Sequence, residues 1–327
     1  MRAMWWIILS GVVLCGLVLY VAREVGPGKR ETPRHLHVSD SVESPVDRAS
    51  PEVQTLLAMI ERLRPLHTGL GRPQEGDWLD VFDEPGQTFR EYLDCDPVRP
   101  QGRRRVIYIQ PLGAFTESQR AIVIATADFL GRYFQLPVRL EDAWPESVVP
   151  ASARRRHPSW GMEQILTTHV LDELLIPQLP DDAAAFLAFT ATDLWPGEGW
   201  NFVFGEASVS DRVGVWSIYR NGDPDSGGDA FRLCLRRTLA TASHETGHMF
   251  SMLHCTLYEC NMCGSNSLEE SDRGPLALCP ECLAKLCWAT GCDPITRYRQ
   301  LAEFCDEHGL ADEQAFYERS IRALTGM

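Results

Sequence analysis

CLRRTLATASHETGHMFSMLHC, running from Cys234 to Cys255, has a composition that predicts a helix and contains the pattern H-E-x-x-H. His244 and His248 stand four positions apart, so on a helix they share one face and can bind one zinc ion. Glu245 then lies near the open coordination position, where a carboxylate can take a proton from a zinc-activated water. The segment therefore predicts a hydrolytic zinc site on a helix.

A third histidine, His254, extends the pattern to H-E-x-x-H-x-x-S-x-x-H. A straight helix would rotate His254 by about 240° from His248, so the chain must turn between them if all three are to bind one ion. Ser251 stands where zinc peptidases of the metzincin type have a glycine. A non-glycine residue at positive φ costs on the order of 1 kcal/mol, which is small beside the affinity of three imidazoles for zinc. We therefore expect His244, His248 and His254 to hold the catalytic ion.

Cysteines are concentrated directly after this helix. Seven of the eleven fall within 38 positions, namely Cys255, Cys260, Cys263, Cys279, Cys282, Cys287 and Cys292. Disulfides suit a small secreted protein that lacks a core, which a chain of 327 residues is not, whereas thiolates at short paired spacing suit zinc. The cluster is therefore interpreted as a metal site.

The order of these residues resembles that of the archaemetzincins. Their extended motif joins a three-histidine zinc helix to a Cys, a C-x-M and a downstream C-x-x-C, which this chain matches with Cys255, with Cys260 to Met262, and with Cys279 to Cys282. The stretches GSNSLEE and LCPECLAKL continue the match, and the resemblance covers roughly residues 104–290.

The resemblance implies a compact metzincin-like fold of the α/β (α+β) class with a mixed sheet and an active-site helix. It also implies two zinc ions, one catalytic on the histidines and one structural on Cys255, Cys260, Cys279 and Cys282. Four thiolates make a closed site without the open position that catalysis requires. Met262 is implied to form an apolar floor beneath the catalytic zinc, against the alternative of an ordinary core methionine. Cys263 is close enough in sequence to replace one of the thiolate ligands, so that alternative stays open.

Outside the motif, apolar periodicity alternates between strand and helix, which predicts a mixed α/β sheet. The predicted strands are 103–113, 137–140, 184–195, 201–205 and 214–219, and the predicted helices are 53–66, 118–134, 162–179, 294–305 and 311–324. The strand 201–205 precedes the zinc helix where a metzincin places the edge strand that pairs with an extended peptide. Trp200 and Trp216 are interpreted as core residues rather than as walls of a substrate groove.

The first residues suggest a membrane anchor. Residues 4–22 read MWWIILSGVVLCGLVLYVA, nineteen uncharged positions, which is about the length that crosses a bilayer. A cleaved signal peptide is the alternative, disfavoured by the poor cleavage site at Tyr20 and Ala22. We expect a single-pass anchor at 1–25, with basic residues slightly favouring a cytoplasmic body. A flexible linker (26–50), a helical or irregular extension (51–100) and a catalytic domain (101–327) are expected to follow.

A net charge of −14 argues against nucleic acid as a partner, because phosphate binding requires clustered basic residues. We expect zinc-dependent hydrolysis of a peptide or protein substrate with Glu245 as general base; the sequence does not predict an oligomeric state. One alternative is a membrane-tethered, zinc-stabilised binding module with negligible peptidase activity, which the intact Glu245 disfavours. Another is a zinc amidase that acts on a non-peptide bond and differs only in its pocket.

Overall fold

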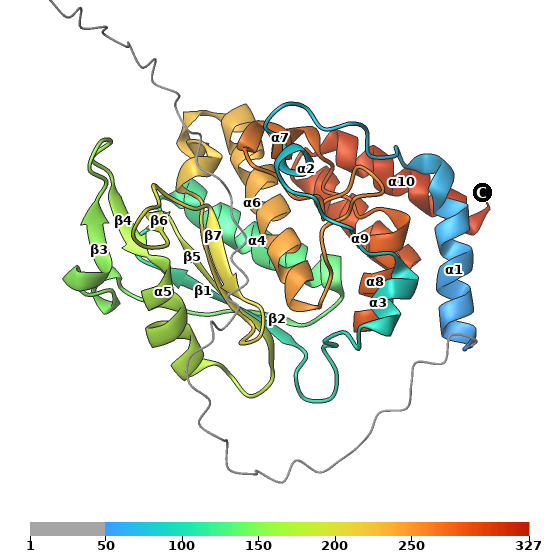
Figure 1. Ribbon diagram of the computed structural model, residues 1–327, viewed down its shortest axis with the longest axis horizontal. Coiled ribbons are helices and arrows are strands. Elements are labelled where there is room, and N and C mark those ends of the chain that lie inside the picture. Colours follow the sequence, from blue (N-terminus) through green and yellow to red (C-terminus); the bar gives the residue numbers. More distant parts are fainter. Residues whose placement is uncertain (1–49, 327) are drawn as a thin grey trace, which may run out of the picture.

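A five-stranded mixed sheet lies in the left-hand half of the molecule in Figure 1, whose computed structural model describes residues 50–326. Its strands follow the order β2-β1-β5-β8-β7. They are β1 (Val106–Leu112), β2 (Val138–Leu140), β5 (Ala183–Thr190), β7 (Gly205–Ser208) and β8 (Val213–Ser217). All neighbours are parallel except β7, which pairs antiparallel with β8 at one edge. Every residue of β5 is buried, as expected for a central strand covered on both faces. The predicted mixed α/β fold is confirmed.

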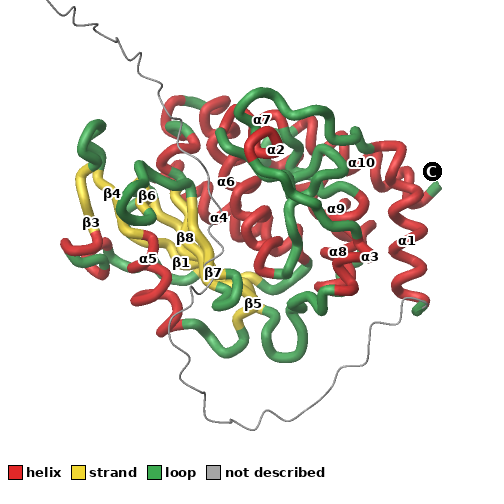
Figure 2. The backbone as a smooth tube through the Cα atoms, in the orientation of Figure 1, coloured by secondary structure: helices red, strands yellow, loops and turns green. Residues whose placement is uncertain are grey.

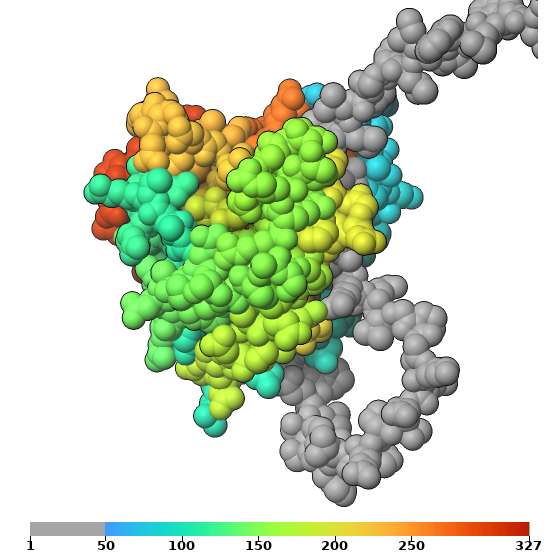
Figure 3. All heavy atoms as spheres, turned by 90° about the vertical axis from the view of Figure 1, so that its left-hand side faces the viewer, coloured from blue at the N-terminus to red at the C-terminus, as the bar shows by residue number. Residues whose placement is uncertain are grey.

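A second, three-stranded sheet in the order β3-β4-β6 lies beside the first. It comprises β3 (Arg154–Arg156), β4 (Glu163–Leu166) and β6 (Asp193–Trp195). Its β3-β4 hairpin contacts the segment before β7, since Arg155 Nη2 donates to the Trp200 carbonyl at 2.9 Å. Figure 3 shows the hairpin in green beside that yellow segment.

The helix predicted over 162–179 is only partly present. Its first residues form β4, and the helix starts as the short α5 (Thr167–His169) and continues as a wider π-helical turn over Val170–Leu175. Gln164 explains the difference, because its side chain is fully buried and donates to Asp193 Oδ2 on β6 at 2.7 Å. Pairing between segments about thirty residues apart therefore overrides the local helical pattern.

Two long helices, α4 (Glu117–Phe134) and α6 (Gly228–Met249), pack together on one face of the large sheet, whereas α5 and the π-helical turn cover the other (Figure 1). The faces alternate along each strand: Ile107 and Ile109 of β1 join the α4–α6 core, and Tyr108 joins the opposite core. A capping box between Thr116 and Gln119 starts α4. The helix α6, which carries the H-E-x-x-H pattern, thus packs on α4 and shares the buried core on this face of the sheet.

The remaining helices form a layer on the far side of α4 and α6 (Figure 2). They are α1 (Pro51–Leu63), α2 (Trp78–Val81), α3 (Phe89–Asp94), α7 (Leu268–Arg273), α8 (Pro280–Thr290), α9 (Pro294–Glu307) and α10 (Ala311–Thr325). The first helix packs against α8 and α10, and Arg62 Nη1 donates to the Leu324 carbonyl at 2.9 Å. The two ends of the described chain therefore lie side by side.

The prediction of a transmembrane helix, with its membrane location and membrane partner, is corrected. Within residues 50–326 no helix combines the length and the apolar composition that a bilayer crossing requires. The two longest, α4 and α6, have 18 and 22 residues, but charged side chains interrupt both, and a span needs ~20 predominantly apolar residues. The stretch 4–22 that suggested the span lies outside the described residues, as does nearly all of the predicted linker 26–50.

Candidate functional site

Three imidazoles meet at the carboxyl end of α6. His244 and His248 lie one turn apart, with ring centroids 4.6 Å from each other. His254 comes from the loop after the helix, and its ring centroid lies 5.3 Å and 4.9 Å from theirs. One nitrogen of each ring lies within 4.8 Å of the others. The three histidines that the sequence pattern singled out are thus brought together.

A left-handed residue makes the turn that returns His254 to the helix. Ser251 has φ 63°, and its N–H donates to the His248 carbonyl at 2.9 Å. Gly247 accepts through its carbonyl from both Phe250 N and Met252 N, which ends the helix. The structure therefore places the reversal at the residue where the sequence required one.

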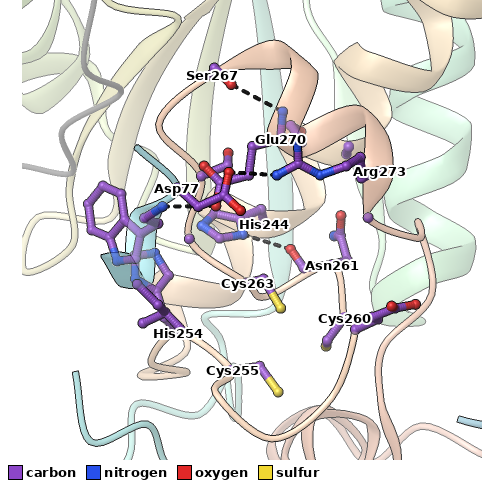
Figure 4. Close-up of a pocket in the computed structure, with 18 of the residues that line it drawn as sticks. Asp77, His244, His254, Cys255, Cys260, Asn261, Cys263, Ser267, Glu270 and Arg273 are labelled. Carbon is purple, nitrogen blue, oxygen red and sulfur yellow. Dashed lines mark hydrogen bonds and ion pairs between the residues drawn. The ribbon is translucent and has the colours of Figure 1, made fainter. Parts of the chain in front are cut away.

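Each ring of the triad uses its Nδ1 atom for a hydrogen bond. His244 Nδ1 lies 2.7 Å from the Asn261 carbonyl (Figure 4), and His248 Nδ1 lies 2.6 Å from the Met252 carbonyl. A carbonyl only accepts, so these Nδ1 atoms carry the protons and the Nε2 atoms carry lone pairs. The two Nε2 atoms lie 2.9 Å apart. Two lone pairs that face each other at this distance can bind one cation. In metal sites, a hydrogen bond to the other ring nitrogen fixes the histidine tautomer in the same way.

Burial keeps the first two imidazoles uncharged. Desolvation, together with nearby His254, lowers the pKa of His244 to about 3, and the same burial lowers the pKa of His248 well below its usual range. A neutral imidazole is the form that binds metal. The donor set therefore fits zinc, which takes nitrogen ligands readily.

Glu245 lies next to the triad and lines the same cavity. Burial raises the pKa of its carboxyl to about 8, since desolvation disfavours the charged form. A bound cation acts in the opposite direction and favours the carboxylate. Glu245 can therefore hold or release a proton near neutral pH, depending on the charge beside it.

The triad opens into a cavity of about 350 Å³ (Figure 4). His244, Glu245 and His254 lie on it. Its other walls come from the N-terminal segment 70–79, from Phe204 and Gly205 at the start of β7, and from the loop 259–275. Glu270 ties two walls together, because its Oε1 accepts from Trp78 N at 2.9 Å. Segments far apart in sequence thus enclose one site.

Met262 packs directly beneath the zinc helix. Its side chain is 1% exposed, and a Cβ added at Gly247 would lie 2.7 Å from its sulfur. Glycine at position 247 is thus what allows the sulfur to approach the backbone just before His248. The thioether therefore lies against the backbone of α6.

Four buried thiols form a second cluster after the helix, with all four sulfurs within 4.8 Å of one another: Cys255, Cys260, Cys279 and Cys282. Backbone N–H groups surround them, since Cys279 N donates to Cys260 Sγ at 3.2 Å and Cys282 N donates to Cys279 Sγ at 3.4 Å. Lys285 Nζ lies 3.8 Å from Cys282 Sγ. Donors and a cation around four sulfurs fit a set of thiolates, which is the ligand form for zinc.

Cys263 lies outside the four-sulfur cluster, and its thiol donates to the Tyr258 carbonyl at 3.2 Å. Cys287 and Cys292 also lie outside it, with their sulfurs 2.6 Å apart at the end of α8. The two clusters are nevertheless close along the chain, because Cys255 follows His254 directly. Figure 4 shows Cys255, Cys260 and Cys263 on the loop that also carries Asn261.

Sequence reasoning missed the residues that reach the site from the N-terminal segment. Glu84 contacts His254 Nδ1 at 2.8 Å, and the Trp78 ring lies edge-on to the His254 ring at 5.0 Å. Both residues stand about 170 positions before the histidine, in a stretch predicted to be irregular. No spacing rule connects them, and the only signal was the presence of acidic and aromatic residues in that stretch. Trp216, by contrast, is buried as predicted.

The sequence matches a known peptidase family and several of its members. The model of peptidase family M54 matches residues 183–287. Archaemetzincin-2 of Macaca fascicularis is 33% identical over 276 residues, which cover 75% of this chain and 76% of that protein. Archaemetzincin of Archaeoglobus fulgidus is 31% identical over 180 residues, 55% of this chain and 98% of that one. The crystal structure of the Archaeoglobus protein with malonate covers 55% of this chain and 99% of its own at 30% identity, with a TM-score of 0.43.

Sequence identity above 30% over three-quarters of both chains is enough to establish kinship, and the matched residues 183–287 contain the histidine triad and the four clustered cysteines. The chain therefore belongs to the archaemetzincin family, and it is a zinc-dependent metallopeptidase.

Proposed function

We propose that Nε2 of His244, His248 and His254 hold the catalytic zinc and that Glu245 is the general base for peptide-bond hydrolysis. The observation that carries this proposal is the orientation of the rings: Nδ1 of each is hydrogen-bonded, so the remaining nitrogens face one point beside a half-buried carboxyl on the cavity. Zinc, when bound, supplies a Lewis acid that polarises the substrate carbonyl and acidifies a water molecule.

The chain's own groups then move the proton. Glu245 takes it from the attacking water and delivers it to the leaving amine, so one carboxyl acts as base and then as acid. The position of Glu245 on the cavity limits competition from bulk water for that proton. No side chain needs to form a covalent bond with the substrate.

We also propose that Cys255, Cys260, Cys279 and Cys282 bind a second zinc ion with a structural role. These cysteines are buried, and their four sulfurs would occupy all four positions of a tetrahedral zinc ion. No coordination position would then remain for a substrate. The ion would tie the loop after His254 to the start of α8. Its loss would therefore loosen the loop that carries the third histidine.

The substrate is proposed to bind as an extended peptide along β7. Within residues 50–326 this strand pairs with β8 alone, and Phe204 and Gly205 at its start line the cavity. An edge strand offers free backbone donors and acceptors to a peptide of any sequence. A small carbonyl compound would not need such an edge, which favours a peptide over a non-peptide amide.

Metal content and activity, measured together on the full chain, test these assignments. We expect two zinc ions per chain, loss of one in His244→Ala and loss of the other in Cys282→Ser. Glu245→Ala should keep both ions and lose cleavage of a mixed peptide library. An unchanged turnover in Glu245→Ala would reject the general-base assignment, and one ion per wild-type chain would reject the second site.

A further inference from the structure

The third histidine differs from the other two in what holds its Nδ1 atom. His244 and His248 bond to carbonyls from the loop that follows the helix. His254 Nδ1 instead lies 2.8 Å and 3.1 Å from the two carboxylate oxygens of Glu84. Glu84 is only partly exposed, at 29%. The hydrogen-bond partner of His254 is therefore a side chain from a segment distant in the sequence.

The segment that carries Glu84 also forms hydrogen bonds with the turn before His254. Gln87 uses both ends of its amide: Nε2 donates to the Ser251 carbonyl at 3.4 Å, and Oε1 accepts from Leu253 N at 3.2 Å. Val98 N donates to Ser251 Oγ at 3.0 Å. A glycine at position 251 would lack that hydroxyl, so the serine gains a contact that offsets part of the strain of its positive φ.

This clamp, residues 84–98, is itself anchored on the helix of the second cluster. Lys285 of α8 is fully buried and donates through Nζ to the Gln87 carbonyl. Phe89 N, at the start of α3, donates to Glu281 Oε2 at 2.7 Å. Glu281 and Lys285 flank Cys282, so α8 holds the clamp with side chains that lie beside the sulfur cluster.

Glu84 is placed to orient the ring rather than to bind the metal. Its oxygens contact Nδ1, whereas the nitrogens of the triad that face one another lie on the other side of the rings. Trp78 packs edge-on against the His254 ring, so the ring is held from two directions. A carboxylate on the outer nitrogen of a ligating histidine fixes the tautomer and increases the basicity of the metal-binding nitrogen.

We propose that Glu84, held by the clamp 84–98, is a positioning residue for the zinc ligand His254, so that the N-terminal segment completes the catalytic metal site. This rests on the proposed assignment of His254 as a zinc ligand. Two ligands come from a rigid helix, but the third comes from a loop that has no regular structure of its own. The clamp supplies the rigidity that this loop lacks.

Zinc affinity tests the proposal without any need for turnover. Full-length protein with both ions bound is titrated with a chromogenic zinc chelator, comparing wild type with Glu84→Ala, Glu84→Gln and Glu84→Asp. We expect Glu84→Ala to weaken one ion by about 10- to 100-fold and to leave the other unchanged. Glu84→Gln keeps an acceptor without the charge and should lie between, and Glu84→Asp should restore part of the affinity.

The matched control is Asp83→Asn, which removes one carboxylate at the exposed neighbouring position and should not alter either affinity. Cobalt substituted into the histidine site adds a spectral readout, and its absorption bands should shift in Glu84→Gln but not in Asp83→Asn. A general loss of folding would weaken both ions together, whereas the proposal requires a loss at one.

Two failures are distinguishable. If His244→Ala still binds two ions, the histidine site itself is wrong and the proposed function fails. If His244→Ala loses one ion but every Glu84 variant holds both ions as wild type does, then only the role of Glu84 is rejected. Equal weakening of both ions in Glu84→Ala would also reject it, because the residue would then support the fold rather than the ligand.

Discussion

We expect zinc binding at the histidine site to release a proton from Glu245. Burial raises the pKa of its carboxyl to about 8, so at pH 7 this carboxyl is expected to be mostly protonated before the metal binds. A zinc ion on the adjacent histidines, as proposed above, would lower that pKa, so the carboxyl would lose its proton when the ion binds. The pKa of His244, at about 3, means that this imidazole is already neutral and releases none.

At pH 7, wild type should therefore release close to one proton more than Glu245→Gln when zinc fills the histidine site. Calorimetric titration in two buffers of different ionisation enthalpy measures this number, with the cysteine cluster already loaded. The excess should shrink above pH 8, where the metal-free carboxyl is already ionised. Equal proton release by the two proteins at pH 7 would mean that Glu245 is ionised without the metal.

Gly247 leaves the space that the Met262 side chain occupies beside the helix. A Cβ there would lie 2.7 Å from the Met262 sulfur, and Met262 is 1% exposed and so has little space to move. We expect Gly247→Ala to destabilise the protein by about 1 to 3 kcal/mol through overpacking, measured by urea unfolding. In Gly131→Ala, a helical control on α4, the new Cβ meets atoms no closer than 3.4 Å.

A double-mutant cycle separates overpacking from a change of helix propensity. In Gly247→Ala/Met262→Ala the space is restored, so the cost of the alanine at 247 should largely disappear. If the alanine costs the same with and without the methionine side chain, the proposed contact is not the cause.

The site residues divide by how they could be predicted. His244, His248 and His254 lie within eleven positions of one another, and their spacing on a helix and turn is enough to infer a shared ion. Glu84 lies 170 positions before His254 in the sequence. Its contact with the histidine depends on how α1, α3 and α8 pack, which no local spacing predicts. Lys285 illustrates the same limit, because it is fully buried and its Nζ donates to the Gln87 carbonyl, 198 positions earlier in the chain.

At the scale of elements, the apolar periodicity correctly predicted those helices and strands whose structure depends mainly on which of their own residues are buried. The strand β1 and the helices α1, α4, α9 and α10 fall where the pattern placed them, whereas the strand predicted over 184–195 is divided into β5 and β6, which lie in different sheets. The pattern failed where a long-range partner decides the outcome, as in β4, which pairs with β3 and β6. It also placed a strand at 201–205, but β7 starts only at Gly205, since the preceding residues form a single bridge from Val203 to Leu194.

The contact between α8 and the clamp is expected to stabilise the fold through Lys285. Lys285→Met has nearly the same volume but leaves the Gln87 carbonyl without its buried donor, which costs about 1 to 3 kcal/mol. Urea unfolding measures the loss. Arg299→Met removes an exposed cation from α9 and should change stability by no more than about 0.5 kcal/mol. A Lys285→Met protein as stable as wild type would show that the donor is not required.

At the scale of the whole molecule, the N-terminal segment 51–100 shares a core with the residues that follow it. Leu56, Ile60 and Leu63 of α1 belong to the same buried cluster as Leu283 and Leu286 of α8. The boundary expected near residue 100 therefore separates two stretches of sequence whose side chains pack together. We propose that residues 51–327 act as one catalytic unit.

If residues 51–327 unfold as one cooperative unit, a substitution in α1 should destabilise the whole unit. Leu63 is fully buried, so Leu63→Ala should lower the free energy of unfolding by about 2 to 5 kcal/mol. Because α1 packs on α8, and two of the clustered cysteines are Cys282 of α8 and its N-cap Cys279, the loss should reach the metal sites. The urea midpoints for tryptophan fluorescence and for zinc release should therefore move together by the same amount. Thr55→Ala, exposed on the same helix, should leave both midpoints unchanged. If Leu63→Ala instead produced an early fluorescence transition while zinc release stayed at the wild-type midpoint, α1 would be an appendage that unfolds by itself.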